Sequence, residues 1–196
     1  MPSSQLALFD ERETGPDGFT YHADAISPEA ERSLLEHCAT LDFRAFEFHG
    51  WTGRRRTVSF GWRYDFSAEA LVETAPMPAF LEPARDAAAL AAGVPPVTLE
   101  QALVTEYDAG AGIGWHRDRS VFGLVVGVSL LSSCRLRMRR PDPVMPTRWE
   151  RMARTVEPRS IYVLDGDARR EWEHSVPPVA DRRYSITFRT LRTGRG

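Results

Sequence analysis

The sequence of 196 residues contains no lysine, and all 25 of its basic residues are arginine. Arginine presents a planar fork of donors that matches carboxylates and phosphates, whereas lysine presents a point charge. A preference for GC-rich codons explains the choice of arginine, but it does not explain where the charges lie. Residues 1–110 hold 18 acidic and 8 basic side chains, and residues 111–196 hold 9 acidic and 17 basic ones. The basic second half favours an anionic partner.

Cysteine is also scarce. Cys38 and Cys134 are too few and too far apart for a disulfide framework, and no C-x-x-C spacing indicates zinc. The N-terminus has no basic segment followed by an apolar core, as a signal peptide would, and no uncharged apolar run is long enough to span a bilayer. We therefore expect a cytoplasmic protein with no membrane partner.

The chain has neither a glycine-rich dinucleotide fingerprint nor a phosphate-binding P-loop, and it has no internal repeat. Two helices are indicated in its first half. Residues 27–41 begin with Ser27 as an N-cap and Pro28 at the first helical position, and leucines then recur at helical spacing. Residues 78–92 are rich in alanine and are followed by Gly93 and a pair of prolines, which end helices.

Between these helices, residues 46–66 alternate strand-like stretches with glycines and predict a hairpin or flap. After Val97 come short runs rich in β-branched and aromatic residues, separated by turn residues, which is the pattern of an antiparallel sandwich or jelly roll. We expect one α+β domain over residues 1–196. N-terminal helices and a flap within residues 1–96 would pack against a jelly-roll core over residues 97–192.

Three side chains of the predicted core have the chemistry of a metal site. His116 and Asp118 flank one residue, so both project to the same side of an extended segment, and His174 comes just before the last predicted strand. Two imidazoles and one carboxylate form the facial triad of non-haem Fe(II) oxygenases, which leaves positions open for a cosubstrate and dioxygen. Taken singly, each residue has a structural alternative: a loop hydrogen bond for His116 and a helix cap for His174. Structural or surface positions are predicted for the remaining histidines, His22, His37 and His49.

The last predicted strand places two arginines on one face. Arg183 and Arg189 share that face with Ser185 and Thr187, because side chains alternate along a strand. Two same-facing arginines on an otherwise apolar strand are costly inside a core unless anions pair with them. A dicarboxylate would satisfy both.

Together these residues closely resemble the AlkB family of Fe(II)/2-oxoglutarate-dependent dioxygenases. The resemblance is carried by the H-x-D at 116–118, the distant His174 and the strand R-Y-S-I-T-F-R at 183–189. The segment that begins at Tyr107 also precedes His116 as the family's N-x-Y-x-x-G segment does. The similarity covers roughly residues 97–192, and the last strand is its most specific part. It implies a double-stranded β-helix, which is a jelly roll, with Fe(II), 2-oxoglutarate and dioxygen as cofactor and cosubstrates.

The resemblance also implies roles for individual residues. Fe(II) would be held by His116, Asp118 and His174. Arg183 would bind the distal carboxylate of 2-oxoglutarate, and Arg189 would act near the proximal carboxylate and Asp118.

Further cosubstrate contacts are assigned to Tyr107, Thr105 and Ser185. Thr105 and Ser185 stand where the family often has asparagine, and both can still hydrogen-bond a carboxylate. Well-known DNA-repair members carry acidic residues shortly after the H-x-D that help read the damaged base, whereas this chain has Arg119 there. We assign Arg119 to the substrate, whose identity this departure leaves open.

The predicted flap resembles the family's nucleotide-recognition lid in position and composition. Enzymes that act on a base hold it unstacked against aromatic faces, while basic residues bind the adjoining phosphates. The substrate contacts assigned here are Trp51, Arg54, Arg55 and Arg56.

Two other patterns have a structural alternative. Alternation places Phe60, Trp62, Tyr64 and Phe66 on one face, and core packing is the better interpretation for most of them. The arginines at 135, 137 and 139 also alternate, on a face that is either solvated or a track for phosphates.

The function implied by the resemblance is oxidative dealkylation of N-alkylated nucleobases in DNA or RNA, as in repair of alkylation damage. Such a demethylase converts 2-oxoglutarate and dioxygen to succinate and carbon dioxide, and the hydroxymethyl product releases formaldehyde. The expected partner is single-stranded or base-flipped nucleic acid, bound by a monomer. One alternative keeps the cofactors but takes tRNA, a protein side chain or a small metabolite as substrate. Another, from a different class, is a non-catalytic nucleic-acid-binding module.

Overall fold

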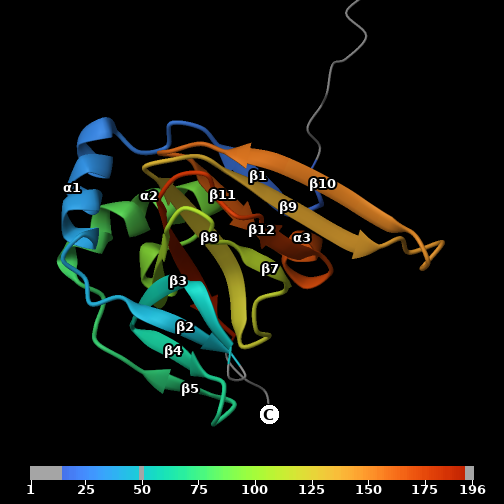
Figure 1. Cartoon of the computed structure of the whole chain (residues 1–196), viewed down its shortest axis with the longest axis horizontal. Helices are drawn as coiled ribbons and strands as arrows, with labels where there is room; N and C mark the ends of the chain where they lie inside the picture. Colours follow the sequence, from blue (N-terminus) through green and yellow to red (C-terminus); the bar gives the residue numbers. More distant parts are fainter. Residues whose placement is uncertain (1–14, 49–50, 193–196) are drawn as a thin grey trace, which may run out of the picture.

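The computed structural model describes residues 15–48 and 51–192, with the side chains of residues 46–48 and 51–53 excepted. Its framework is a seven-stranded sheet, which we call the major sheet, and a four-stranded minor sheet (Figure 1). The order in the major sheet is β1 (Phe19–His22), β11 (Ile161–Leu164), β8 (Phe122–Leu130), β13 (Arg183–Leu191), β6 (Gln101–Tyr107), β3 (Trp51–Phe60) and β2 (Arg44–Phe48). The order in the minor sheet is β10 (Trp149–Val156), β9 (Cys134–Pro141), β12 (Glu173–Val176) and β7 (Ile113–His116).

The two predicted helices are present. Helix α1 (Pro28–Cys38) begins where expected, because the Ser27 hydroxyl accepts a hydrogen bond from the Ala30 amide at 3.1 Å. Helix α2 (Glu82–Ala92) follows a 3₁₀ turn, η1 (Ala79–Leu81), and ends at Gly93, which adopts a left-handed φ of 67°. A second 3₁₀ turn, η2 (Pro96–Thr98), and a short helix, α3 (Gly166–Arg170), complete the helical elements of the described ranges. None of these helices is long and apolar enough to cross a membrane.

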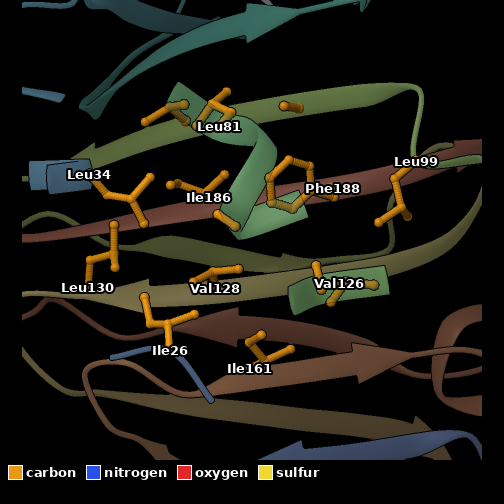
Figure 2. Packing of buried hydrophobic residues seen from close by; sticks show 14 of the residues in the cluster. Ile26, Leu34, Leu81, Leu99, Val126, Val128, Leu130, Ile161, Ile186 and Phe188 are labelled. Carbon is orange, nitrogen blue, oxygen red and sulfur yellow. The ribbon is translucent and has the colours of Figure 1, made fainter. Parts of the chain in front are cut away.

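The largest hydrophobic core lies between the helices and one face of the major sheet. Figure 2 shows Ile186 and Phe188 of β13 beside Val128 of β8, with Leu81 of η1 packed over them. Because side chains alternate along β13, the residues between these apolar ones face the other way. The helices therefore cover one face of the major sheet and leave its polar face, with both predicted arginines, for the site.

The predicted α+β architecture, with helices and a flap beside two antiparallel sheets, is present, although four strands of these two sheets were not predicted. Three of these, β1, β7 and β12, have only four residues each, and β10 has charged residues on both faces. The helix-cap alternative for His174 is wrong, because α3 ends at Arg170 and His174 lies in β12.

The flap consists of two parts. Strand β2 pairs with β3 and extends the major sheet, whereas β4 (Trp62–Asp65) and β5 (Ala70–Glu73) form a separate ribbon. The break between β3 and β4 falls at Gly61, whose φ is +74° and whose missing Cβ would lie 2.1 Å from the Glu100 carbonyl oxygen. Only glycine fits this close approach.

Phe188→Ala is expected to lower the free energy of unfolding by about 3–5 kcal/mol, because the ring is fully buried and its removal leaves a cavity. Chemical denaturation measures this change. Leu90→Ala is the control: Leu90 is 85% exposed, so its loss should change stability by less than about 0.5 kcal/mol. Equal effects of the two substitutions would contradict the placement of the core.

Candidate active site

The three predicted metal ligands come together on the minor sheet. Strands β7 and β12 are neighbours, and His116 and His174 are direct cross-strand partners with ring centroids 4.3 Å apart. Asp118 follows two residues after His116. One ligand atom from each residue lies within 4.8 Å of the others. The structure therefore joins residues that are far apart in the sequence into a 2-His-1-carboxylate set.

Hydrogen bonds orient these ligand atoms. The His116 Nδ1 lies 2.9 Å from the Gly114 carbonyl oxygen, which can only accept, so Nδ1 carries the proton and Nε2 keeps its lone pair. The Asp118 Oδ1 is 3.7 Å from the His116 Nε2 and 3.9 Å from the His174 Nε2. Both distances exceed a hydrogen bond. Three electron-pair donors thus converge without bonding one another, which fits a metal ion.

An ion pair across the cavity fixes the carboxylate. Arg189 of β13 donates from Nε to the Asp118 Oδ2 at 2.7 Å, and its Nη1 donates to Gln101 of β6 at 2.8 Å. Oδ1 is left facing the imidazoles. Burial alone would raise the pKa of Asp118, but Arg189 and the two histidines outweigh it and hold that pKa well below its usual range. Asp118 is therefore an anion at neutral pH.

Both imidazoles are neutral at the same pH. Burial, and then the neighbouring His116, lower the pKa of His174 to about 3. Burial also lowers the pKa of His116, although Asp118 opposes the shift. Neutral imidazole is the form that binds a metal, so the site needs no deprotonation of either histidine near pH 7.

A cavity of about 1400 Å³ opens beside the triad, between the two sheets. The predicted cosubstrate residues Thr105, Tyr107, Ser185, Arg183 and Arg189 all line it. Arg183 is 2% exposed, and among the described residues no carboxylate pairs with it.

The contacts of Arg183 leave part of its guanidinium unused. Its Nη2 donates to the Ser129 hydroxyl at 3.0 Å and the group lies 5.1 Å from the Tyr107 ring centroid. Its Nε is buried without a hydrogen-bond partner in the described structure. A buried cation with an unused donor is costly, and a ligand carboxylate in the cavity would satisfy it.

The cavity mouth is formed by the flap and the segment after Asp118. Tyr64 and Phe66 line the cavity, with rings 5.2 Å apart and nearly perpendicular. Arg119 lies over both, 4.9 Å from the Tyr64 centroid and 5.0 Å from that of Phe66. Core packing, predicted for most of the flap aromatics, is therefore correct for Phe60 and wrong for Tyr64 and Phe66.

The predicted arginine run in β3 is divided by the alternation of the strand. Arg55 lines the cavity, where burial lowers its pKa and Tyr107 and Asp118 partly offset the effect. Arg56 is on the other face and donates to Glu106 at 2.9 Å, while the Tyr184 hydroxyl donates to the same carboxylate at 2.9 Å. Arg54 is exposed. Trp51 begins β3, but its side chain is not among those described.

The other histidines do not belong to this cluster. His37 stacks on Phe80 with ring centroids 4.6 Å apart, and His22 lies 3.2 Å from the Thr20 hydroxyl. His49 is outside the described residues. Cys38 and Cys134 are buried free thiols.

Arg169 lies behind the candidate metal site, although no pattern in the sequence indicated it. Arg169 of α3 is 6% exposed and donates to three backbone carbonyls, of Gly123 at 2.8 Å, Arg119 at 2.7 Å and Phe122 at 2.7 Å. These carbonyls belong to the segment that carries Asp118 into β8. Nothing in the spacing of the sequence marks an arginine in a five-residue helix for this position.

Known proteins share the family and the fold of this chain. The model of the 2OG-Fe(II) oxygenase superfamily matches residues 18–189. The uncharacterized protein L905 of Acanthamoeba polyphaga mimivirus is 30% identical over an alignment of 105 positions, which covers 47% of this chain and 48% of the viral protein. The match thus spans about half the length of that relative. The structure of OsALKBH1 superposes with a TM-score of 0.63 over 88% of this chain and 96% of its own, at 15% identity.

The chain therefore belongs to the 2OG-Fe(II) oxygenase superfamily. Fe(II), 2-oxoglutarate and dioxygen are the cofactor and cosubstrates of this enzyme class, so the predicted cofactors and the predicted dioxygenase class are confirmed. The likeness to OsALKBH1 confirms the AlkB-like fold.

Arg169→Lys is expected to weaken metal binding, because an ammonium group cannot reach three carbonyls as the guanidinium fork does. Lost charge-assisted bonds should also lower the unfolding free energy by about 2 kcal/mol or more. Metal titration followed by tryptophan fluorescence, together with denaturation, measures both effects. Arg170→Lys is the matched control, since the Arg170 side chain is 54% exposed and pairs with Asp167. Identical metal affinities in the two variants would show that Arg169 does not position Asp118.

Proposed function

We propose that the protein is an AlkB-type dioxygenase that oxidatively removes methyl or other alkyl groups from nucleobases of DNA or RNA. The observation that carries the proposal is that the triad, the buried Arg183 and a mouth of aromatic rings and arginines share one cavity. A base taken out of its stack needs flat apolar surfaces, and its phosphates need cations. Tyr64 and Phe66 supply the former, and Arg55 and Arg119 supply the latter.

In this proposal His116, Asp118 and His174 hold Fe(II), and Arg183 binds the distal carboxylate of 2-oxoglutarate. When bound, the metal supplies the redox chemistry that converts 2-oxoglutarate and dioxygen to succinate and carbon dioxide and hydroxylates an N-alkyl carbon. Arg189 keeps one oxygen of Asp118 turned toward the histidines.

The hydroxyl groups of the cavity complete the assignment. Thr105 and Ser185 are direct cross-strand partners, both nearly buried, and Tyr107 lies below the Arg183 guanidinium. We assign these hydroxyls to the carboxylates of 2-oxoglutarate, which accept hydrogen bonds from them. The hydroxymethyl group left on the nitrogen is unstable in water and leaves as formaldehyde.

One observation favours a second candidate substrate. Arg119 replaces the acidic residues that well-known DNA-repair members carry at this point, and it caps the aromatic mouth. A cation there suits an anionic group close to the oxidised atom, as in tRNA, a protein side chain or a metabolite. The cytoplasmic location and the monomeric state stay predictions, as does action on nucleic acid in DNA repair.

Succinate formation tests the proposed function directly. Protein with Fe(II) and 2-oxoglutarate is expected to form succinate and formaldehyde in equal amounts from an N-methylated single strand in a panel of DNA, RNA, tRNA, nucleosides and peptides. His174→Ala should abolish this turnover, because two ligands do not hold the metal. His37→Ala should retain it, because His37 is an exposed residue of α1 that does not line the cavity. Full activity of His174→Ala would refute the ligand assignment. Turnover restricted to tRNA, peptides or metabolites would assign the second candidate.

Arg183→Ala is expected to weaken 2-oxoglutarate binding at least tenfold, since a lost charge-assisted contact costs about 1.5–3 kcal/mol. Isothermal titration measures the affinity, and thermal unfolding verifies that the variant is folded. The neighbouring Arg182 is the control, because its side chain is 56% exposed and pairs with Asp108 outside the cavity. If Arg183→Ala and Arg182→Ala bind 2-oxoglutarate equally well, Arg183 has no role in cosubstrate binding.

A further inference from the structure

The minor sheet has a second, solvent-facing side that the proposed chemistry does not use. Its residues alternate with those that face the cavity, and the exposed end of the β9–β10 hairpin lies at the opposite end of the molecule from α1 (Figure 1). We call this side the outer face. It is defined by Trp115 of β7, Arg135, Arg137 and Arg139 of β9, and Trp149 and Arg151 of β10.

Arginines and tryptophans are stacked on the outer face. Arg139 lies between two indoles, 4.3 Å from the Trp115 centroid and 4.4 Å from the Trp149 centroid. Arg137 also lies over Trp115, at 4.9 Å. Stacking uses the flat faces of a guanidinium and leaves its edges to donate hydrogen bonds. The indole rings therefore hold the guanidinium groups of Arg137 and Arg139 in place, with their N–H edges available to a ligand.

The charges on this face do not cancel. Four arginines share it with one carboxylate, Glu173, which accepts from the Arg139 Nε at 2.8 Å. Arg139 and Arg151 are moreover direct cross-strand partners. Like charges placed opposite each other destabilise a sheet. An anion bound on the outer face would offset this repulsion, which explains why the arginines are placed there.

The outer face continues into the cavity. Trp115 lines the cavity wall as well as lying under the arginines, and its neighbour His116 is a predicted metal ligand. Strands β7 and β10 are the two edges of the minor sheet, so the face runs from the cavity mouth at β7 across β12 and β9 to β10. Three steps between strands cover about 14 Å, a length that several nucleotides of a single strand occupy.

We propose that the outer face binds the single strand that flanks the base held in the cavity, with phosphates on the arginines and a base on Trp149. This inference rests on the proposed function. Single-stranded nucleic acid is the occupant that matches both features, because guanidinium forks fit phosphates and indoles stack bases of any sequence. Trp149 is 37% exposed and so retains surface for such a contact.

Arg151→Glu gives the sharpest test, because stability and binding should change in opposite directions. Replacing the repulsion with Arg139 by an attraction should raise the midpoint of urea unfolding. Affinity for a single strand of about 12 nucleotides should fall, and the slope of log affinity against log salt should flatten by about 1 or more. Trp149→Ala should lower the affinity about tenfold, as expected for one stacked base.

The binding measurement uses enzyme with metal and 2-oxoglutarate, without dioxygen, and an unmethylated fluorescent strand. Arg32→Glu on α1 is the control, because it makes the same change of net charge away from the outer face. Its affinity for the oligonucleotide should fall only slightly, through the weaker general attraction, and should stay well above the affinity of Arg151→Glu. Turnover of a methylated nucleoside, which reaches only the cavity, should be the same in all variants. Tight binding of the oligonucleotide that depends on Arg151 and Trp149, with no turnover of any substrate, would contradict the proposed function but support the outer-face proposal. Turnover with equal strand affinity in Arg151→Glu, Trp149→Ala and Arg32→Glu would overturn the outer-face proposal alone.

Discussion

The ion pair between Arg189 and Asp118 is the interaction on which the site depends. Arg189 belongs to β13 of the major sheet and Asp118 follows β7 of the minor sheet, so their 2.7 Å contact joins the two sheets across the cavity. Both side chains are nearly buried. Removal of either partner would leave an uncompensated buried charge, at a cost of about 3–5 kcal/mol. The same contact therefore ties the orientation of the Asp118 carboxylate to the position of β13.

Arg183 lies on the same strand as Arg189, but its charge is not neutralised in the same way. Arg189 has a carboxylate partner in the chain itself, whereas Arg183 has a serine hydroxyl and an aromatic ring, with Nε unpartnered. The free protein bears the cost of this desolvated cation, and a bound carboxylate removes it. Binding of a dicarboxylate is consequently coupled to the stability of β13. Two arginines on one face of one strand therefore differ in their partners: Arg189 is bound to Asp118, and Arg183 is the one that the proposed function assigns to the cosubstrate.

The sequence predicts the site better than its surroundings, for physical reasons. The shared face of Arg183 and Arg189 follows from the two-residue period of strands, which holds along the regular strand β13. The ligand set came from the resemblance instead, because Asp118 lies beyond the end of β7 and His174 lies in another strand. The same period failed for the flap aromatics, because Gly61 turns the chain before Tyr64 and Phe66 and sends them to the cavity. Arg169 could not be predicted, since its importance comes from three carbonyls on a segment about 50 residues away. Alternation in β3 also explains why only Arg55 of the 54–56 run reaches the cavity.

The minor sheet combines two chemistries because its two faces alternate residue by residue. Trp115 and His116 are adjacent in β7, yet Trp115 contacts the arginines of the outer face and His116 belongs to the triad at the cavity. Any displacement of β7 would therefore move the metal ligand and the aromatic surface together. Arg169 restrains the segment that follows, and the pairing of His116 with His174 restrains the strand itself. The backbone of β7 is thus held on both sides of the proposed metal ligands. Nucleic acid bound on the outer face would therefore orient the substrate without displacing those ligands.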